Sequence, residues 1–343
     1  MQWLIVTRTT VLNEAGIESL SRVVTNSVPP KVFVLILSYN GRRWLEECLP
    51  SVLQMDYPNF EVVVIDNGSS DGTGEYLQSE FPDVQNVRIF PNVGYSRGFD
   101  AGLVYAAARG AEYFLIMNND TVIDRGALTA LIETATAMDH AGFITGKVYF
   151  HARPDVFQCV GKEEDPVRWN GNYMGFGEID TGQYEEITER VWVDDVYVLV
   201  SRKMYDEIGG YDTQYFFQCE EWDWQIRAKK KGWHIYYTPA AKIWHRVSAT
   251  IGGAGGPISE YFLQRNWVVV IARHGGGKRF IRYVAVSCYE DFKGLLGAIF
   301  RLNATMLKPR LARFLGFLAG ISWLLHRHPP TRVPRLIQWL AEK

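Results

Sequence analysis

Between residues 31 and 120, apolar runs that resemble strands alternate with stretches of helical spacing, and this alternation constrains the fold most. The apolar runs contain few polar positions, which is typical of parallel strands covered by helices on both faces. Repeated strand–helix units predict an α/β fold with a mostly parallel sheet flanked by helices. The predicted strands are 31–40, 60–66, 87–92 and 112–120, and the predicted helices are 41–55, 73–81 and 96–110.

All four predicted strands lead into a polar residue: Asn40, Asp66, Asn92 and Asp120 stand at or just after their carboxyl ends. Ligands bind at that edge in open α/β sheets. The last of these residues, within "NND", raises a question, because a buried carboxylate must be paired, hydrogen-bonded or bound to a metal. Asn and Asp are also frequent in turns, so a simple turn remains an open alternative at this point.

The loop after the first strand decides which kind of nucleotide site is expected. A dinucleotide-binding fold needs G-x-G-x-x-G there, and a P-loop ends in G-K-[ST]. The sequence has "SYNGRRW", with a single glycine, so it contains neither phosphate-binding loop. A diphosphate can instead be held by a divalent metal ion on carboxylates.

The remainder of the chain divides into three predicted parts. Residues 1–30 form an N-terminal extension that ends in two prolines, and 31–270 form the α/β domain, with a strand, helix and turn over 191–212 and a helix and strand over 220–245. Residues 271–343 form a C-terminal helical region rich in Lys, Arg and aromatic residues. Such a region is typical of contact with an anionic membrane surface, or of a helical subdomain with a basic solvent face. The apolar residues expected to face lipid are Phe314, Leu315, Leu318, Ile321 and Leu325.

Composition excludes several classes of protein. The formal net charge of -2 argues against a general nucleic-acid binder. The four cysteines are far apart, which fits a reducing compartment without a disulfide framework. The sequence shows no signal-peptide pattern and no apolar run long enough to span a bilayer. We therefore expect a cytoplasmic protein, at the inner face of the cell membrane if the basic region binds lipid.

Several motifs together resemble family-2 nucleotide-sugar glycosyltransferases of the GT-A fold. The segments that carry this resemblance are "LSYNGRRW", "VIDNGSSDGT", "PNVGYSRGFDAGL" and "YFLIMNNDT". Later segments resemble the rhamnosyltransferase-like branch of that family, namely "GEIDTGQYEE", "GGYDTQYFFQCEEWDWQIR" and "PAAKIWHRVS". The resemblance implies inverting transfer of a sugar, with dTDP-rhamnose as the suggested donor, to a hydroxyl of a saccharide or lipid-linked acceptor. It also implies Mn²⁺ or Mg²⁺ as cofactor.

The same resemblance assigns roles to individual residues. In the place of the family's D-x-D metal motif this chain has "NND", so Asp120 is expected to bind the metal together with His245. The expected catalytic base is Glu221, in the place of the family's Asp, with Glu220 second and Asp195 or Asp223 in reserve. Asp223 is four residues from Arg227 and is expected to pair with it. The expected donor-binding residues are Ser38, Asn40, Asp66, Asn67, Asn92, Gly94, Asn118 and Asn119.

Two other functions remain as alternatives. A sugar nucleotidyltransferase has a related sheet, but it needs a glycine- and arginine-rich loop after the first strand, which "SYNGRRWLEE" does not provide. A catalytically silent relative could act as an assembly scaffold, since Asn118 and the Glu pair depart from the family pattern. The glycine-rich segment at 251–257 is expected to act as a lid over the diphosphate.

Overall fold

The computed structural model describes residues 28–165, 169, 171–246, 255–300, 304–326 and 332–342. Residues 1–27 of the predicted extension and residues 251–254 of the predicted lid therefore lie outside the described residues. From Lys31 onward the chain forms one compact unit.

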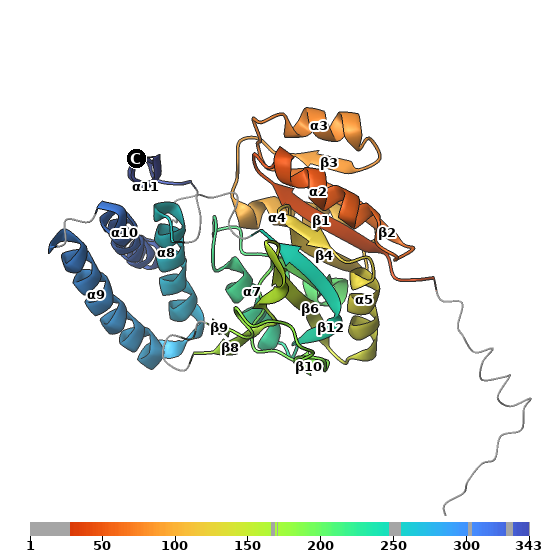
Figure 1. Cartoon of the computed structure of the whole chain (residues 1–343). Helices are drawn as coiled ribbons and strands as arrows, with labels where there is room; N and C mark the ends of the chain where they lie inside the picture. Colours follow the sequence, from red (N-terminus) through yellow and green to blue (C-terminus); the bar gives the residue numbers. More distant parts are fainter. Residues whose placement is uncertain are drawn as a thin grey trace, which may run out of the picture. The chain divides into compact units, whose positions relative to one another are not determined.

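The first half of that unit contains four parallel strands in the order β3-β2-β1-β4 (Figure 1). The strands are β1 (Val32–Ser38), β2 (Phe60–Asp66), β3 (Gln85–Arg88) and β4 (Tyr113–Asn118), and the intervening helices are α2 (Arg42–Leu53), α3 (Thr73–Glu80) and α4 (Tyr95–Ala107). The predicted α/β class is confirmed. The third strand was predicted over 87–92, but β3 ends at Arg88, and Ile89 only adds one bond to the carbonyl of Asp66.

The second half extends the same sheet beyond β4 in the order β11-β6-β12-β10. β11 is antiparallel to both β4 and β6, whereas β12 runs parallel to β6. The elements are β5 (Thr121–Ile123), α5 (Ala127–Ala137), β6 (Ala141–Phe150), β7 (Arg153–Cys159), β8 (Lys162–Glu164), β9 (Gly171–Tyr173), β10 (Thr188–Glu189), β11 (Tyr197–Ser201), α6 (Arg202–Ile208), α7 (Glu220–Lys229) and β12 (His234–His245). The sheet is therefore mixed rather than wholly parallel.

Strand β1 shows why its sequence is continuously apolar. Alternate residues point to opposite faces of a strand, so Val34 packs among helices α2, α3 and α5, while Leu35 packs among α4, α6 and α7. Both faces are covered, and residues 32–36 are fully buried. Because the register pairs Ser38 with Asp66 and Leu37 with Asn118, the polar ends of β1, β2 and β4 meet at one edge of the sheet.

The C-terminal region consists of four helices, α8 (Pro257–His274), α9 (Gly276–Phe300), α10 (Ala304–His326) and α11 (Arg335–Glu342). Helix α10 lies close against α8, since a Cβ at Gly316 would stand 2.2 Å from the carbonyl oxygen of Tyr261. Helix α8 is tied to the segment before α7, because the side-chain amide of Asn266 donates to the carbonyls of Phe217 and Gln218. Among the described residues, no helix is both long and apolar enough to cross a membrane.

Candidate active site

Asn67 organises the loops at the carboxyl ends of β2 and β3. Its side chain is 2% exposed, and its amide group donates to Asn92 Oδ1 at 3.2 Å and to the carbonyl of Gly94 at 3.0 Å. Its oxygen accepts from the backbone N–H of Val93 at 3.0 Å. The predicted donor-binding residues Asn67, Asn92 and Gly94 therefore lie together. The side-chain hydrogen bonds of Asn67 and Asn92 hold the loop in its conformation.

The predicted residues Ser38 and Asn119 are also joined. The amide of Asn119 donates to the Ser38 hydroxyl at 3.0 Å, and both side chains are buried. Gly41 lies against this pair, because a Cβ there would stand 2.0 Å from the amide nitrogen of Asn119. A glycine at position 41 is thus required by close packing.

Asn40 and Asp66 meet through the serine turn at residues 68–70. Ser69 donates its N–H to Asp66 Oδ1 at 2.9 Å and accepts the N–H of Asn40 on its hydroxyl at 2.9 Å. The other carboxylate oxygen of Asp66 lies 3.5 Å from Arg88 Nε and accepts no hydrogen bond within the described residues. Asp66 is fully buried, so this oxygen, which has an ion pair but no hydrogen bond, could accept one from a ribose hydroxyl or a base N–H.

The "NND" segment contains a turn that brings the two predicted metal ligands together. Residues 119–120 form the turn that joins β4 to the short strand β5, which pairs with the end of β12. The pairing sets Thr121 opposite His245, and as a result Asp120 Oδ1 lies 3.2 Å from His245 Nε2. Both predicted metal ligands are about 6% exposed. Asn118 lies beside them at the end of β4, and its Oδ1 is 3.3 Å from the Tyr95 hydroxyl.

Gln158 fixes the orientation of the histidine ring. Its Oε1 lies 2.9 Å from His245 Nδ1, and an amide oxygen only accepts, so Nδ1 carries a proton. When the ring is neutral, Nε2 therefore presents a lone pair toward the Asp120 carboxylate. A proton on Nε2 or a divalent cation bound by both groups would join them. Their separation also fits two neighbouring ligands of an octahedral metal with bonds of about 2.1 Å, which stand about 3 Å apart. The pair fits a divalent metal ion.

A second cluster consists of three carboxylates. Asp195 precedes β11, and Glu220 and Glu221 begin α7, where one oxygen from each lies within 4.8 Å of the others. Glu220 is 3% exposed, and its Oε2 accepts no hydrogen bond within the described residues. Glu221 and Asp195 are only partly buried, so these two are the members that a ligand can reach.

Burial and mutual repulsion perturb all three groups. Burial, followed by repulsion from Asp195, raises the pKa of Glu221 to about 8. Burial also raises the pKa of Asp195 to about 6, and it raises the pKa of Glu220 well above its ordinary value, with the neighbouring Glu221 as the next cause. Carboxyl groups with pKa values this close to neutrality are suited to proton transfer.

A buried ion pair adjoins the cluster. Lys162 and Asp194 form a salt bridge, and the Lys162 ammonium also lies 5.0 Å from the centre of the Trp222 ring. The positive charge of Lys162 lowers the pKa of Glu221 and so opposes the effect of burial. Because its pKa lies close to neutrality and it is only partly buried, Glu221 is the member best suited to accept a proton.

Tyr95 connects the donor side with the acid cluster. Its hydroxyl lies 3.3 Å from Asn118 Oδ1 and 3.4 Å from the carbonyl oxygen of Asp195. Tyr211 donates to the Asp195 carboxylate at 3.0 Å. Sequence reasoning kept Asp195 only in reserve and did not identify Tyr95, Tyr211 or Lys162. The signal for Asp195 was two successive acids in an otherwise apolar run, "VWVDDVYVLV".

Two further acids, Asp223 and Asp71, have structural partners. Asp223 pairs with Arg227 at 2.8 Å and with His274 Nε2 at 2.8 Å, so the predicted pairing of Asp223 is confirmed. Asp71 accepts from the N–H groups of Arg42 and Thr73 and thereby caps two helices.

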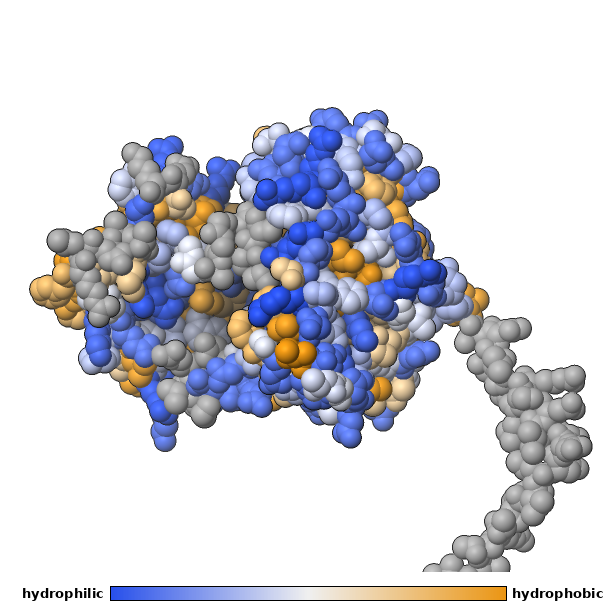
Figure 2. Space-filling view, in the orientation of Figure 1, coloured by the Kyte–Doolittle hydropathy of each residue, from blue (hydrophilic) through white to orange (hydrophobic). Residues whose placement is uncertain are grey.

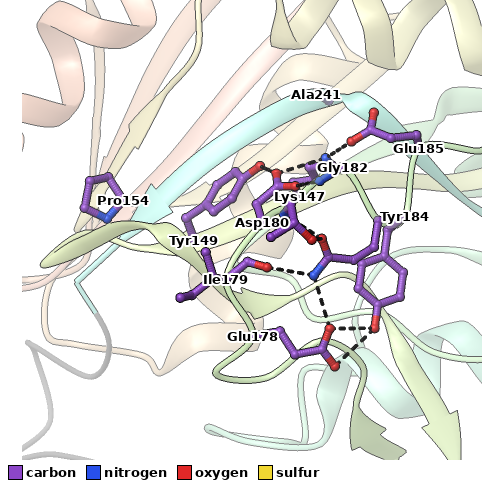
Figure 3. A network of polar contacts seen from close by, with 12 residues as sticks. Lys147, Tyr149, Pro154, Glu178, Ile179, Asp180, Gly182, Tyr184, Glu185 and Ala241 are labelled. Carbon is purple, nitrogen blue, oxygen red and sulfur yellow. Dashed lines mark hydrogen bonds and ion pairs between the residues drawn. The ribbon is translucent and has the colours of Figure 1, made fainter.

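The segment 178–185 is anchored on the sheet by a lysine. Lys147 is 1% exposed and pairs with Asp180, at 3.1 Å, and with Glu185. Tyr149 donates to the same Asp180 oxygen at 2.5 Å, and Figure 3 shows these side chains converging from β6 and the loop. The loop in "GEIDTGQYEE" therefore has a fixed attachment.

The structure and sequence match known proteins. The N-acetylglucosaminyl-diphospho-decaprenol L-rhamnosyltransferase of Mycobacterium tuberculosis is 23% identical over 267 residues, which cover 71% of this chain and 85% of the relative. A mannosyltransferase from Pyrobaculum calidifontis, solved with GDP-Man and Mn²⁺, matches with a TM-score of 0.52 and 15% identity over 86% of this chain and 88% of that one. GalNAc-T7, solved with UDP, GalNAc and Mn²⁺, matches with a TM-score of 0.59 and 14% identity over 89% of this chain and 59% of that one.

These structural neighbours share the GT-A fold, and the fold prediction is confirmed. The family model described as "Glycosyltransferase like family 2" matches residues 29–254, which is more than half of the chain. That match decides against a sugar nucleotidyltransferase. The chain belongs to glycosyltransferase family 2.

Proposed function

We propose that this glycosyltransferase transfers a sugar with inversion from a nucleoside diphosphate to an acceptor hydroxyl, and that Glu221 is the catalytic base. The observation that carries the proposal is the acid cluster, in which a partly buried Glu221 has its pKa raised to about 8 beside Asp195 and Glu220. Direct displacement needs a base of this kind, because the acceptor hydroxyl must lose its proton as it attacks.

In the proposed reaction the acceptor oxygen forms a bond to the anomeric carbon from the side opposite the leaving group. The bond between that carbon and the diphosphate oxygen breaks, and the nucleoside diphosphate leaves with the electron pair. The acceptor proton passes to a Glu221 carboxylate oxygen. Burial and the nearby Asp195 raise the pKa of Glu221, which makes its carboxylate a stronger base.

Asp120 and His245 would hold the divalent metal ion. The supporting observation is that His245 Nε2 and Asp120 Oδ1 lie 3.2 Å apart while Gln158 holds the other ring nitrogen. A bound metal ion stabilises the charge of the departing diphosphate. The Asp66 oxygen that accepts no hydrogen bond and the loop held by Asn67 would contact the nucleoside, with Ser38, Asn40 and Asn119 supporting them.

The donor sugar and acceptor class are proposed from the relatives. The Mycobacterium tuberculosis relative is named as an L-rhamnosyltransferase acting on a decaprenol-linked sugar. We therefore propose a rhamnosyl donor such as dTDP-rhamnose and a saccharide or lipid-linked acceptor, used by a cytoplasmic enzyme at the inner face of the cell membrane.

For membrane contact, the helix face expected from sequence is only partly available, since Leu318 and Leu325 are exposed but its other members are not. Leu315 and Ile321 of α10 are partly buried in apolar clusters with α8, so they are unsuited to face lipid. Helix α9 instead has the exposed apolar stripe, visible at the left edge of Figure 2 near the end of the helix. Its exposed members recur at helical spacing and are 37–82% exposed: Ile281, Tyr289, Phe292, Leu296, Ile299 and Phe300.

Basic residues flank this α9 stripe, namely Lys278, Arg279, Arg282 and Lys293. Each basic residue near an anionic surface contributes about 1 kcal/mol to binding. Flotation of the full-length chain with phosphatidylglycerol liposomes at low salt should therefore succeed and should fail for Phe292→Glu. The matched control is Leu318→Glu, at a 48% exposed position on α10, which should still float. Equal flotation of both variants would contradict the assignment to α9.

The catalytic proposal is tested with a panel of dTDP-, UDP- and GDP-sugars in Mn²⁺, Mg²⁺ or EDTA. We expect metal-dependent release of nucleoside diphosphate from one donor, and an inverted anomeric configuration in the transferred product by NMR. If none of the donors releases diphosphate with either metal, the chain is better explained as a catalytically silent scaffold.

A further inference from the structure

Three aromatic rings form a continuous strip on β6, β9 and the turn after β9. Phe150 and Phe176 have ring centres 5.5 Å apart, and Phe176 and Tyr173 have ring centres 6.0 Å apart. Phe176 is 61% exposed and Tyr173 is 45% exposed, while the Arg153 guanidinium lies 4.7 Å from the Phe150 ring. We call Phe150, Tyr173 and Phe176 the aromatic strip. Packing in the core does not explain aromatic rings that are this exposed. A contact with a ligand would explain their position.

One end of the aromatic strip lies beside the proposed metal pair. Phe150 is the register partner of His245 across the parallel strands β6 and β12, so the two side chains leave the sheet on the same face. The next residue, His151, donates its N–H to the carbonyl of His245 at 3.0 Å.

The other end lies beside the acid cluster. The Lys162 ammonium stands 4.7 Å from the centre of the Tyr173 ring, and the Tyr173 hydroxyl hydrogen-bonds Asp194. Lys162 is also close enough to Glu221 to lower its pKa. The aromatic strip therefore runs from the side of the leaving group to the side of the base.

The segment that carries the two exposed rings is held in place by its backbone. Met174 donates its N–H to the carbonyl of Gly161, and Gly177 donates to that of Phe157 at 2.9 Å. Immediately beyond, the buried Lys147 fixes Asp180 and Glu185 (Figure 3). Phe176 is thus exposed on a firmly attached turn, which makes it a preformed contact rather than a frayed end.

We propose that Phe176, together with Tyr173, binds the sugar ring of the acceptor. This inference rests on the proposed function, since the acceptor hydroxyl must reach Glu221 and its sugar must then lie over the aromatic strip. The apolar C–H face of a pyranose packs on an aromatic ring, and its hydroxyls stay free to point at the Lys162–Asp194 pair. Phe176 would then select acceptors that present such a face next to the reacting hydroxyl.

Ligand-observed NMR on the full-length protein with Mn²⁺ and dTDP tests this inference. The probes are four octyl β-hexosides, namely the glucoside, galactoside, mannoside and N-acetylglucosaminide, and only protein aromatic protons are saturated. We expect saturation to reach the ring C–H protons of at least one sugar. Phe176→Ala should lower its affinity about tenfold, as expected for losing an aromatic contact, and Phe176→Trp should retain it.

The control variant is Leu53→Ala, at a 45% exposed position at the end of α2. It should bind the probes like the parent. The proposal is overturned if no sugar receives saturation in the parent or if Phe176→Ala binds the probes as well as the parent. It is also overturned if only the octyl chain receives saturation, which would indicate a contact with the lipid chain. Donor hydrolysis, measured in parallel, separates the two ideas, because Phe176→Ala should keep it even if the proposed acceptor contact is wrong.

Discussion

The donor-side loops and the acid cluster use polar residues in opposite ways. In the donor-side loops, Asn67, Asn92, Ser38 and Asn119 satisfy one another through hydrogen bonds. In the acid cluster three carboxylates repel one another, and one oxygen of Glu220 has no hydrogen bond within the described residues. Hydrogen bonds that satisfy every polar group hold a loop in one conformation. Buried carboxylates that repel one another destabilise the folded state, and such groups are typical of functional sites. The comparison predicts different responses to mutation on the two sides.

The largest expected effect lies in the acid cluster. Glu221→Gln keeps the size of the side chain but cannot accept a proton, so kcat should fall about 10²–10⁴-fold. Donor affinity should change little, because the donor-side loops are intact. Transfer kinetics and calorimetric donor binding check both statements, with Glu220→Gln as the matched variant. A larger loss in Glu220→Gln would move the base by one residue.

The pH dependence of transfer should report the same cluster. Because burial raises the pKa of Glu221 to about 8, the ionised base becomes scarcer below that pH. The rate should therefore rise about tenfold per pH unit through the region below 8 and level off above it. Lys162→Met removes a charge that lowers this pKa, so the rising limb should move to higher pH. A limb that stays in place would separate Lys162 from the base.

The metal pair provides a test of intermediate size. If Asp120 and His245 hold a metal ion, dTDP should bind more tightly with Mn²⁺ than with EDTA, and Asp120→Ala should abolish that gain. Gln158→Ala frees the His245 ring and should reduce Mn²⁺ affinity about 10–100-fold. Calorimetry measures both variants, and Asp83→Ala, at an exposed acid, is the control. Identical dTDP affinity with and without metal would remove the metal from the mechanism.

On the donor side, mutation should cost stability. Asn67→Ala leaves the buried N–H of Val93 and carbonyl of Gly94 without their partner, which should destabilise the fold by about 1–3 kcal/mol. Chemical denaturation compares it with Gln78→Ala, an exposed helical position where about 0.5 kcal/mol or less is expected. An unchanged midpoint for Asn67→Ala would mean that this network does not hold the loop.

In the acid cluster, by contrast, one mutation should increase stability. The folded-state pKa of Glu220 is raised above its unfolded value, so this group favours folding at low pH and that contribution is lost as pH rises. At pH 8 the free energy of unfolding of Glu220→Gln should therefore exceed that of the parent by on the order of 1 kcal/mol. The variant should accordingly unfold at a higher temperature. Near pH 4 the two should be alike. Equal melting temperatures of the variant and the parent at both pH 4 and pH 8 would show that Glu220 does not destabilise the folded protein.

Much of the donor side could be predicted from sequence because its information is local. Leu45, Leu49 and Val52 mark the buried face of α2, and β1, β2 and β4 are mainly apolar runs. The exception is β3, which was placed too late because the apolar "IF" after Arg88 resembles strand although Pro91 lacks an N–H for the ladder.

The acid cluster was harder to predict because distant segments form it. Glu220 and Glu221 were found through the family resemblance, whereas their proximity to Asp195 depends on how α7 packs beside the start of β11. Tyr95 and Lys162 had no sequence signal, since a tyrosine or lysine near an apolar run usually has a structural role. In the same way, sequence could not reveal that α8 covers part of the apolar surface of α10, the helix predicted to face lipid.

The irregular pairing of β12 gives the metal pair an unexpected vulnerability. Between Tyr237 and Lys242 the register of β12 against β6 shifts, and only after this shift does His245 align with Phe150 and Thr121. Side chains alternate between the two faces of a strand, so a one-residue slip would turn the imidazole to the opposite face. A single-residue deletion at Ala240 could thus erase the site while every proposed ligand remains in the sequence. The spacing between residues 237 and 242 is therefore as much a part of the site as the histidine itself.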